Sequence, residues 1–510
     1  MGILEVVCVA SVMDETDFVD GNFGPTHRRA GRIEFPALEA KEAVTDVYIH
    51  SDLSSERQQQ VKRLLGSYQD VLTDLPGKTS LGSHSIRLKS DEPVRLKPYP
   101  LPHARRDVIR EETKKMLDLG VIEHSESPYA SPIVLVKKSD GTNRFCIDFR
   151  KLNRITIFDA EPMPNPDEIF ACLSTARFFS KLDLSKGYWQ IPLTEQDKEK
   201  TAFLTPDGLF QFKVMPFGLI NAPATFSRVM RLVLHGLPHV HNYIDDILIH
   251  TETWEEHMAT LKALLCRLRQ ANLTAKPSKC QLCCPKVEFL GHVVGEGLLK
   301  PMEDKLEKIS NALRPETKKQ LRSFLGLAGY YRKFIPNFST IATPLTDRTK
   351  SREPNRVVWT ERQEEAFGTL KKCLTSGPIL CLPNFQKQFT LRTDASDTGI
   401  GAILLQDHVG DKQPVAYASR KLLPREQAYS VMERECLAIV WGITKFEVYL
   451  DGKEFVLETD HQPLMYLQRS KLLNSRIMRW ALSLQPFRFR IEAIAGVHNV
   501  GADFLSRVSS

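Results

Sequence analysis

The chain has 510 residues, of which 42% are hydrophobic and 26% are charged, and a formal net charge of +7. This length exceeds one ordinary hydrophobic core, so several domains are expected, and the mild basic excess is compatible with a polyanionic partner. The ten cysteines follow no disulfide-framework spacing, which favours a reducing compartment, and no apolar run reaches the length of a membrane span.

The N-terminal part of the chain contains few regular patterns. Residues 1–50 show weak periodicity and mixed polarity, which is typical of a linker or an irregular lead-in. From residue 54 to about 72, apolar residues recur at helical spacing, which predicts an N-terminal helical extension over residues 51–89. Ser54 or Ser55 is the expected N-cap of this helix.

A β-hairpin is predicted next. Two apolar runs, residues 133–138 and 144–149, flank an Asp-Gly turn signal at residues 140–141. The rim of the hairpin carries the cations Lys137 and Arg144. These residues by themselves favour a solvated turn, and the functional alternative is a cationic clamp on a phosphate tail.

Three acids follow at strand ends. A strand over residues 178–183 ends in Asp183, and residues 240–249 predict a tight hairpin with Asp245 and Asp246 at its turn. Two ionised neighbours repel each other and lose hydration when enclosed, and a bound divalent cation removes both costs. A solvated turn is the simpler explanation of each acid alone. If the sheet brings Asp183 to the hairpin, three carboxylates can hold the two cations used in phosphoryl transfer.

The segments around these acids suggest substrate contacts. Tyr188 follows the first acid and would flank the sugar of an incoming nucleotide, with core packing as the alternative. Residues 215–226 contain Gly and Pro residues that break regular structure before a helix. Residues 287–294 predict a strand pair around Gly291, and His292 is expected to pack or to contact the backbone.

Together these segments resemble a reverse transcriptase, most closely those of gypsy-type LTR retrotransposons. The resemblance rests on the surroundings of Asp183, residues 215–226, the box from Tyr243 to Asp246, and residues 289–294. It implies fingers and palm over residues 90–300, with a core at about 116–295, and a thumb and connection over residues 301–384.

The resemblance also implies residue roles. It assigns catalysis and metal binding to Asp183, Asp245 and Asp246. It assigns nucleotide contacts to Lys137, Arg144, Tyr188 and Phe217, among which Tyr188 is the gate that excludes ribonucleotides. It assigns the primer grip to Phe289, Leu290, Gly291 and His292. Retroviral enzymes carry Gln in place of Phe217, whereas gypsy-type enzymes share the Phe, so this residue indicates the subgroup.

Helices dominate the pattern after residue 300. Pro301 is expected to open a helix through about Leu313, and a second helix carries an apolar stripe of Leu321, Phe324, Leu325 and Ala328. Residues 330–334 then mix aromatic and basic side chains. Contact with a nucleic-acid backbone and packing of an amphipathic core helix explain this mixture equally well.

A second set of acids lies in a C-terminal αβ pattern. Four of them stand at the ends or margins of predicted elements: Asp394, Glu435, Asp460 and Asp503. Each alone is explained as a cap or a surface charge. Their order resembles the ribonuclease H fold over residues 385–510, which implies that all four bind metal and act in catalysis. The loop before Asp503 is short and lacks the His-bearing loop of cellular ribonucleases H, which is where this module departs from the cellular pattern.

The predicted fold class is multidomain α+β: a right-hand polymerase with fingers, palm and thumb, then a connection and a ribonuclease H-like αβ domain. The expected activities are RNA- and DNA-directed DNA synthesis and degradation of RNA in RNA–DNA hybrids, with two Mg²⁺ ions per active site and Mn²⁺ as the alternative. The expected partners are template–primers, hybrids, deoxynucleoside triphosphates, and protease and integrase portions of the same polyprotein, with no membrane. The expected location is the cytoplasm, within virus-like particles. The alternative is a catalytically silent, retrotransposon-derived nucleic-acid-binding protein.

Overall fold

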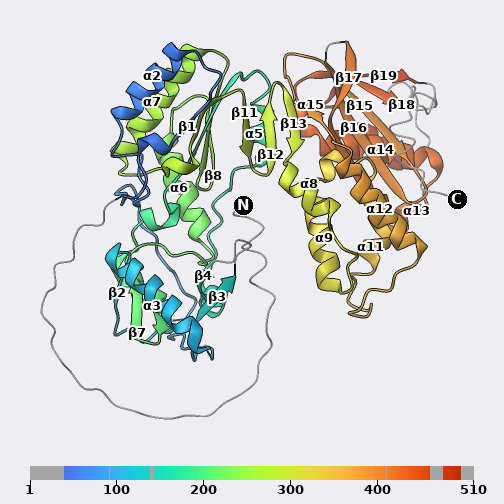
Figure 1. The fold of residues 1–510 in the computed structure, drawn as a ribbon. Coiled ribbons are helices and arrows are strands. Elements are labelled where there is room, and N and C mark those ends of the chain that lie inside the picture. Colours follow the sequence, from blue (N-terminus) through green and yellow to red (C-terminus); the bar gives the residue numbers. More distant parts are fainter. Residues whose placement is uncertain are drawn as a thin grey trace, which may run out of the picture. The chain divides into compact units, whose positions relative to one another are not determined.

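The chain divides into two compact units (Figure 1). The computed structural model describes residues 40–90, 92–100, 102–137, 143–408, 410–459 and 475–494. The first unit comprises Met1–Asn165 and Phe178–Cys284, and the second comprises Pro166–Arg177 and Pro285–Ser510. The structure divides the two units after Cys284, and the strands that follow form a sheet of their own. The predicted boundary between palm and thumb at residue 300 stays a prediction.

Five strands form the main sheet of the first unit, in the order β1-β10-β5-β9-β8. They are β1 (Tyr48–Ile49), β5 (Phe178–Asp183), β8 (Val240–Tyr243), β9 (Asp246–Thr251) and β10 (Gln281–Cys284). β8 and β9 form the predicted acidic hairpin, and β5 pairs with β9 in antiparallel register. Ile247, Leu248 and Ile249 are all buried, so β9 is covered on both faces and anchors the hairpin.

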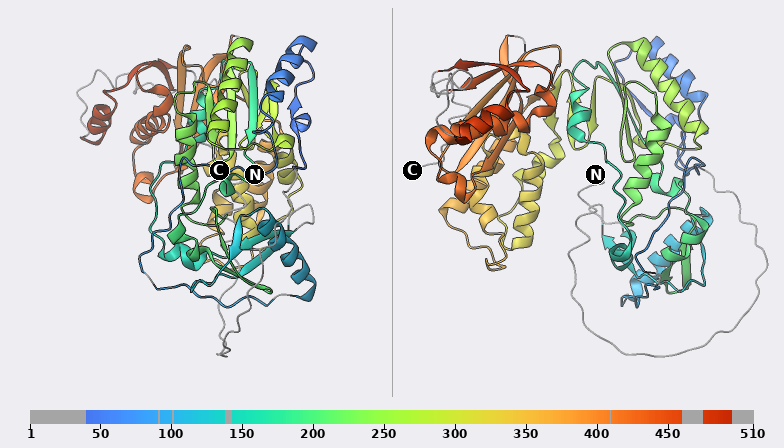
Figure 2. Two further views of the ribbon diagram at one scale, coloured as in Figure 1. Left: turned by 90° about the vertical axis from the view of Figure 1, so that its left-hand side faces the viewer. Right: turned by 180° about the vertical axis from the view of Figure 1, so that it is seen from behind.

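Helices pack on this sheet through apolar stripes. The helices are α2 (Ser55–Gly66), α6 (Ala222–Leu234) and α7 (Trp254–Gln270). α7 buries four leucines at helical spacing, Leu261, Leu264, Leu265 and Leu268. Burial of each contributes roughly 1.5–3 kcal/mol. α2 lies beside α7 (Figures 1 and 2), and Trp254 Nε1 donates a hydrogen bond to Gln60 there. Ser54 caps α2 as predicted, accepting from the Arg57 amide.

The predicted lead-in is partly wrong. Residues 1–39 lie outside the described residues, but Val44–Asp46 form a 3₁₀ turn, η2, and β1 joins the main sheet parallel to β10. The partner strand lies more than 200 residues later in the chain, so a local pattern of two residues carries no signal of this pairing.

Two smaller sheets complete the first unit. One has the order β2-β7-β6, and the other pairs β3 with β4. The strands are β2 (Ile122–His124), β3 (Ile133–Lys137), β4 (Asn143–Ile147), β6 (Phe203–Thr205) and β7 (Gly208–Phe212), and the helices are α3 (His103–Asp118) and α4 (Arg150–Ile155). β3 and β4 form the predicted hairpin, whose turn at residues 138–142 lies outside the described residues.

The second unit begins with a four-stranded sheet in the order β11-β12-β13-β14. Its strands are β11 (Lys286–Phe289), β12 (His292–Gly295), β13 (Leu298–Pro301) and β14 (Leu380–Cys381). The helices of this part are α5 (Pro166–Ala171), α8 (Glu303–Ser310), α9 (Lys318–Tyr330), α10 (Phe338–Ile341), α11 (Thr343–Asp347) and α12 (Glu361–Thr375). The prediction that Pro301 opens a helix is wrong, because Pro301 pairs with His292 at the end of β13, and α8 begins at Glu303 after the N-cap Met302.

The C-terminal module of the second unit is a five-stranded mixed sheet in the order β17-β16-β15-β18-β19. Its strands are β15 (Phe389–Ala395), β16 (Gly399–His408), β17 (Asp411–Lys421), β18 (Glu454–Thr459) and β19 (Arg488–Ala493). Its helices are α13 (Pro424–Gln427), α14 (Val431–Lys445), α15 (Glu447–Leu450) and α16 (Ser475–Ser483), the last of which the sequence patterns did not predict. α14 lies close on the sheet because Gly442 has no side chain: a Cβ there would come within 3.1 Å of Thr393 Cγ2.

In the part of the chain that the structure describes, no helix combines the length and the apolar character needed to cross a bilayer.

Candidate active sites

The first acid site forms where β5 meets the β8–β9 hairpin. Asp183 and Asp246 are direct cross-strand partners in the β5–β9 register. The Leu184 amide donates to the Asp245 carbonyl at 3.1 Å, which ties the end of β5 to the hairpin turn. The sheet therefore brings together the three acids that the sequence patterns singled out in the first unit.

The turn that carries Asp245 is strained. Tyr243 pairs with Asp246, so only Ile244 and Asp245 connect the two strands. Ile244 has a φ of 53°, a left-handed conformation that β-branched residues rarely adopt and that costs on the order of 1–3 kcal/mol. Such strain persists only where the surrounding structure enforces it, and it is concentrated at functional sites.

Burial, and after it the repulsion between neighbouring acids, determines the electrostatics of this site. Burial, together with the negative charges of Asp183 and Asp246, raises the pKa of Asp245 to about 6. Burial also raises the pKa of Asp183, against the opposing charge of Lys279. A cation near these carboxylates would relieve both effects.

Two lysines supply positive charge to the acids. Lys279 Nζ donates to both carboxylate oxygens of Asp183, at 3.0 and 3.2 Å, and Lys181 Nζ lies 3.2 Å from Asp246 Oδ1. Sequence reasoning missed both lysines. Lys181 stands two residues before Asp183 on the same strand face, so its position near the acids could have been predicted from the strand alternation. Lys279 reaches the site only through the β5–β10 pairing, which no local pattern indicates.

The donor set fits a hard divalent cation. Among the described residues, no three His, Cys, Asp or Glu side chains stand close enough together to hold one ion as they are placed. Lys279 and Lys181 contact two of the acids. Three carboxylates that repel one another are nevertheless the oxygen-rich set that Mg²⁺ and similar ions prefer. Asp183, Asp245 and Asp246 are therefore the residues that would hold such an ion.

An aromatic wall borders the acids. The Tyr188 ring lies 5.0 Å from the Phe217 ring and 5.5 Å from the Phe226 ring. Burial and the nearby Asp245 charge raise the pKa of Tyr188, so its hydroxyl stays protonated. Phe217 is 45% exposed, which leaves its ring accessible to a ligand. Tyr188 is thus beside the acids as predicted, and its contact with a nucleotide stays a prediction.

Gly187 is needed for the close approach of the acidic turn. A Cβ on Gly187 would stand 3.2 Å from Asp245 Cβ and 3.2 Å from the Phe226 ring. We expect Gly187→Ala to displace Asp245 by a few tenths of an ångström and to lower the rate of nucleotide incorporation about tenfold, since small misplacements of reacting groups are costly. The matched control is Gly66→Ala at the end of α2, where an added Cβ meets no atom within 4 Å. A rate unchanged by Gly187→Ala in single-nucleotide incorporation would contradict this account of the turn.

The two predicted phosphate-binding cations lie on the small β3–β4 hairpin. Val136 pairs with Arg144, and Lys137 pairs with Asn143, so both cations stand at the turn end of the hairpin. The Lys137 side chain lies outside the described residues. The phosphate clamp stays a prediction.

The predicted primer grip is the turn between β11 and β12. Leu290 has a φ of 47° and Gly291 a φ of 71°, so both residues are left-handed. Two tyrosine hydroxyls hold this turn: Tyr330 Oη donates to the Leu290 carbonyl at 2.6 Å, and Tyr331 Oη to the Gly291 carbonyl at 2.7 Å. The two tyrosines at the C-terminal end of α9 therefore hold a turn of their own unit, which favours the packing explanation for residues 330–334.

His292 is a structural residue, as predicted. It is 3% exposed, and its Nδ1 lies 2.7 Å from the Leu290 carbonyl. Four rings surround it at 5.1 to 5.6 Å, those of Phe170, Tyr330, Tyr331 and Phe334. Burial lowers the pKa of His292 to about 3, so the ring is neutral and cannot serve as a charged contact.

The buried hydroxyl of the clamp should matter more than the exposed one. Tyr331 is fully buried, whereas Tyr330 is 39% exposed. We expect Tyr331→Phe to lower the free energy of unfolding in urea by about 1–2 kcal/mol, because the Gly291 carbonyl loses a donor that water cannot replace. Tyr330→Phe should cost about 0.5 kcal/mol or less, since water can hydrate the Leu290 carbonyl. The account is wrong if the two variants unfold alike.

The second acid site lies in the C-terminal module. Asp394 stands near the end of β15 and Glu435 on the second turn of α14, and both side chains are buried, at 5% and 6% exposure. Both side chains are hard oxygen donors of the kind that divalent ions such as Mg²⁺ prefer. Asp460 and Asp503 lie outside the described residues, and their convergence on these two acids stays a prediction.

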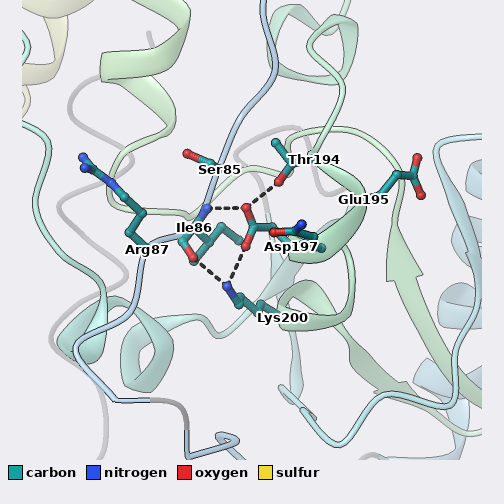
Figure 3. Close-up of a pocket in the computed structure, with 8 residues that line it drawn as sticks. Ser85, Ile86, Arg87, Thr194, Glu195, Asp197 and Lys200 are labelled. Atoms are coloured by element: carbon teal, nitrogen blue, oxygen red, sulfur yellow. Dashed lines mark hydrogen bonds and ion pairs between the residues drawn. The ribbon is translucent and has the colours of Figure 1, made fainter.

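A concavity elsewhere in the first unit has a structural role (Figure 3). Its volume is about 550 Å³. Asp197 accepts from the Ile86 amide at 3.0 Å and from Lys200 Nζ at 2.6 Å, and Lys200 also donates to the Ile86 carbonyl at 2.8 Å. These charges satisfy one another and join the chain around Ile86 to the 3₁₀ turns η4 (Glu195–Asp197) and η5 (Glu199–Thr201).

Comparison with protein families finds two matches in the order expected. Residues 136–294 match a model described as reverse transcriptase (RNA-dependent DNA polymerase). Residues 384–487 match a model described as the RNase H-like domain found in reverse transcriptase. The two matched regions contain Asp183, Asp245 and Asp246 in the first case, and Asp394, Glu435 and Asp460 in the second.

Solved structures share the fold. A foamy viral protease–reverse transcriptase in complex with double-stranded DNA has a TM-score of 0.79 and 23% identity, covering 91% of this chain and 84% of that chain. The same viral protein with an RNA/DNA hybrid has a TM-score of 0.76 and 23% identity, covering 93% and 65%. The right-hand polymerase fold followed by a ribonuclease H-like domain is thereby confirmed.

Curated relatives are retrotransposon proteins. The Pol polyprotein of transposon 297 from Drosophila melanogaster is 39% identical over 89% of this chain and 44% of its own length. That of transposon gypsy is 36% identical over 91% and 46%, and the Schizosaccharomyces pombe Tf2-3 polyprotein is 36% identical over 80% and 31%. The chain thus spans 31% to 46% of the length of these relatives. It contains a reverse transcriptase domain followed by an RNase H-like domain, and it is similar to Pol polyproteins of gypsy-type retrotransposons.

Proposed function

We propose that the chain is an RNA- and DNA-directed DNA polymerase that also degrades the RNA strand of RNA–DNA hybrids. The observation that carries this proposal is the cluster of Asp183, Asp245 and Asp246 at a strained hairpin inside a reverse transcriptase domain. The natural role would be to copy the RNA of a retrotransposon into DNA and to remove the template afterwards.

The polymerase acids would bind two Mg²⁺ ions. All-oxygen donors and phosphate substrates favour Mg²⁺ over softer metals, with Mn²⁺ as a substitute. Held by these three carboxylates, such cations would supply the positive charge that stabilises phosphoryl transfer. The chain's own contribution is to fix three carboxylates at one sheet end, so that no reorganisation is needed when the substrates arrive.

The surrounding residues would select and orient the substrates. Tyr188 and Phe217 form an aromatic surface beside the acids, where a deoxyribose can pack and a 2′-hydroxyl would collide with Tyr188. Lys137 and Arg144 would pair with the triphosphate, because cations on a hairpin rim can reach several phosphate oxygens. The turn from Phe289 to His292 would hold the primer end.

The C-terminal acids would hydrolyse RNA. Asp394 and Glu435, with Asp460 and Asp503, would bind two divalent cations that activate water at the scissile phosphate. The partners of the chain would be RNA and DNA template–primers, RNA–DNA hybrids and deoxynucleoside triphosphates. Protease and integrase portions of a Pol polyprotein are further proposed partners, and the proposed location is the cytoplasm, within virus-like particles.

Primer extension tests the polymerase proposal. The purified chain is incubated with poly(rA) annealed to oligo(dT), deoxythymidine triphosphate and Mg²⁺. We expect extension that stops when EDTA removes the cation or when the template is omitted. A folded chain that extends no primer with either Mg²⁺ or Mn²⁺ would overturn the proposal and favour a silent nucleic-acid-binding protein.

A further inference from the structure

The N-terminal segment of the first unit reaches the loop that carries Lys279. This loop, residues 274–280, leads into β10 and includes the 3₁₀ turn η6 (Pro277–Lys279). On one side it is bonded to the acid site: the Lys276 amide donates to the Asp183 carbonyl at 2.8 Å, and Lys279 Nζ bonds the Asp183 carboxylate. The position of Lys279 therefore depends on what holds the other side of the loop.

Residues 40–50, called the strap below, hold that other side. The Tyr48 amide donates to the Cys280 carbonyl at 3.1 Å, and the His50 amide to the Leu282 carbonyl at 3.2 Å. These bonds fix the strap along β10, directly after η6. The strap is itself fixed to the rest of the unit, because the Lys41 amide donates to Asp74 Oδ1 at 3.0 Å.

Glu42 makes the contacts between the strap and the loop. Its Oε2 accepts from the Ser278 amide at 3.0 Å, and its Oε1 lies 3.2 Å from Lys276 Nζ. Glu42 is only 21% exposed at its side chain, so these interactions are partly shielded from water. One carboxylate thus holds the residues on both sides of Pro277, within a single turn of Lys279.

We propose that the strap is a positioning element for the polymerase site and that Glu42 sets how firmly Lys279 engages Asp183. Lys279 and a divalent cation compete for the same carboxylate, since one oxygen pair cannot fully satisfy both. Weakening the strap should loosen the Lys279–Asp183 pair and thereby favour cation binding. This inference rests on the proposed role of Asp183, Asp245 and Asp246 as cation ligands.

The test measures Mn²⁺ binding to the intact chain without nucleic acid, by the electron paramagnetic resonance signal of free Mn²⁺. The part of the binding that is lost in Asp245→Asn defines the polymerase site and separates it from the ribonuclease site. We expect Glu42→Ala to lower the Kd for Mn²⁺ at the polymerase site about fivefold, which is a typical size for coupling between two binding events. Glu42→Gln, which keeps the shape and an acceptor for Ser278, should give a smaller decrease.

Two further variants isolate the path through Lys279. Glu56→Gln removes the same charge from an exposed position in the first turn of α2 and should leave the Kd unchanged. In a Lys279→Met background, Glu42→Ala should have no further effect, because the competing ammonium is already gone. A merely structural role of Glu42 would reduce the fraction of folded chain without changing the Kd.

The outcomes separate the two proposals. If Asp245→Asn binds as much Mn²⁺ as the parent chain, both the cation-site proposal and the strap proposal are wrong. If the cation site is present but Glu42→Ala and Glu42→Gln leave the Kd unchanged or raise it, the strap proposal alone is overturned. The same holds if Glu42→Ala acts equally with and without Lys279.

Discussion

We expect Asp245→Asn to lower the rate of primer extension by roughly 10²–10³-fold or more, because it removes charge from the centre of the cation site. Asn keeps the size of the side chain and the backbone bond from Leu184. Burial and the neighbouring acids raise the pKa of Asp245 to about 6, so its ionised form is unfavourable in the folded chain and the substitution removes that unfavourable charge. The thermal unfolding temperature in the absence of metal should therefore not fall.

A lower rate of primer extension together with an unchanged unfolding temperature would separate a functional role of Asp245 from a structural one. Single-nucleotide incorporation and thermal unfolding are measured on the same preparations, and cleavage of a preformed RNA–DNA hybrid serves as the internal control. Incorporation at a rate near that of the parent would show that Asp245 is not essential to the site. Loss of both activities with a large fall in the unfolding temperature would show that Asp245 acts through the fold.

The second large effect concerns the ribonuclease site. We expect Asp394→Asn to lower cleavage of the RNA strand in a hybrid by roughly 10²–10³-fold, because a buried metal-binding carboxylate becomes neutral. Primer extension should remain close to that of the parent. The matched control is Asp411→Asn, an exposed acid at the start of β17 in the same sheet, which should cleave normally. Equal cleavage by Asp394→Asn and Asp411→Asn would contradict the assignment.

The acid-bearing elements were predictable because their signals are local. β-branched runs on either side of Asp245 and Asp246 define a hairpin, and the register then places Asp183 opposite Asp246. The start of α14 is equally local: the side chain of Ser430 accepts from the Glu433 amide, and Glu433 closes a capping box. Such features depend on a few neighbouring residues, which the sequence displays directly.

The features that sequence reasoning missed depend on distant partners. β1 forms because Tyr48 and Ile49 pair with Gln281 and Leu282. The residues around neither segment indicate that the other is its partner. Lys279 reaches Asp183 only through the β5–β10 pairing, and Glu42 reaches the loop that carries Lys279 only through the β1–β10 pairing. The hydrogen bond from Tyr331 to the Gly291 carbonyl likewise joins residues 40 positions apart. The sequence alone could not distinguish this hydrogen-bonding role from ordinary packing of an aromatic side chain.

The division of the chain was also a matter of tertiary pairing. β11 pairs with β12, β12 with β13, and β13 with β14 about 80 residues later, so these strands form a sheet that belongs to the second unit. The roles of Lys137, Asp460 and Asp503 stay predictions, because the Lys137 side chain and both acids lie outside the described residues.

The most direct measurement follows both strands of one substrate in a single reaction. A DNA primer and its RNA template carry different labels, and the intact chain is supplied with deoxynucleoside triphosphates and Mg²⁺. We predict that the intact chain lengthens the primer and shortens the RNA. Asp245→Asn should abolish primer lengthening but still cleave the RNA of a preformed hybrid. Asp394→Asn should abolish RNA cleavage but still lengthen the primer. A folded chain that does neither, or a pair of variants that lose both activities together, would contradict two separate carboxylate sites in one chain.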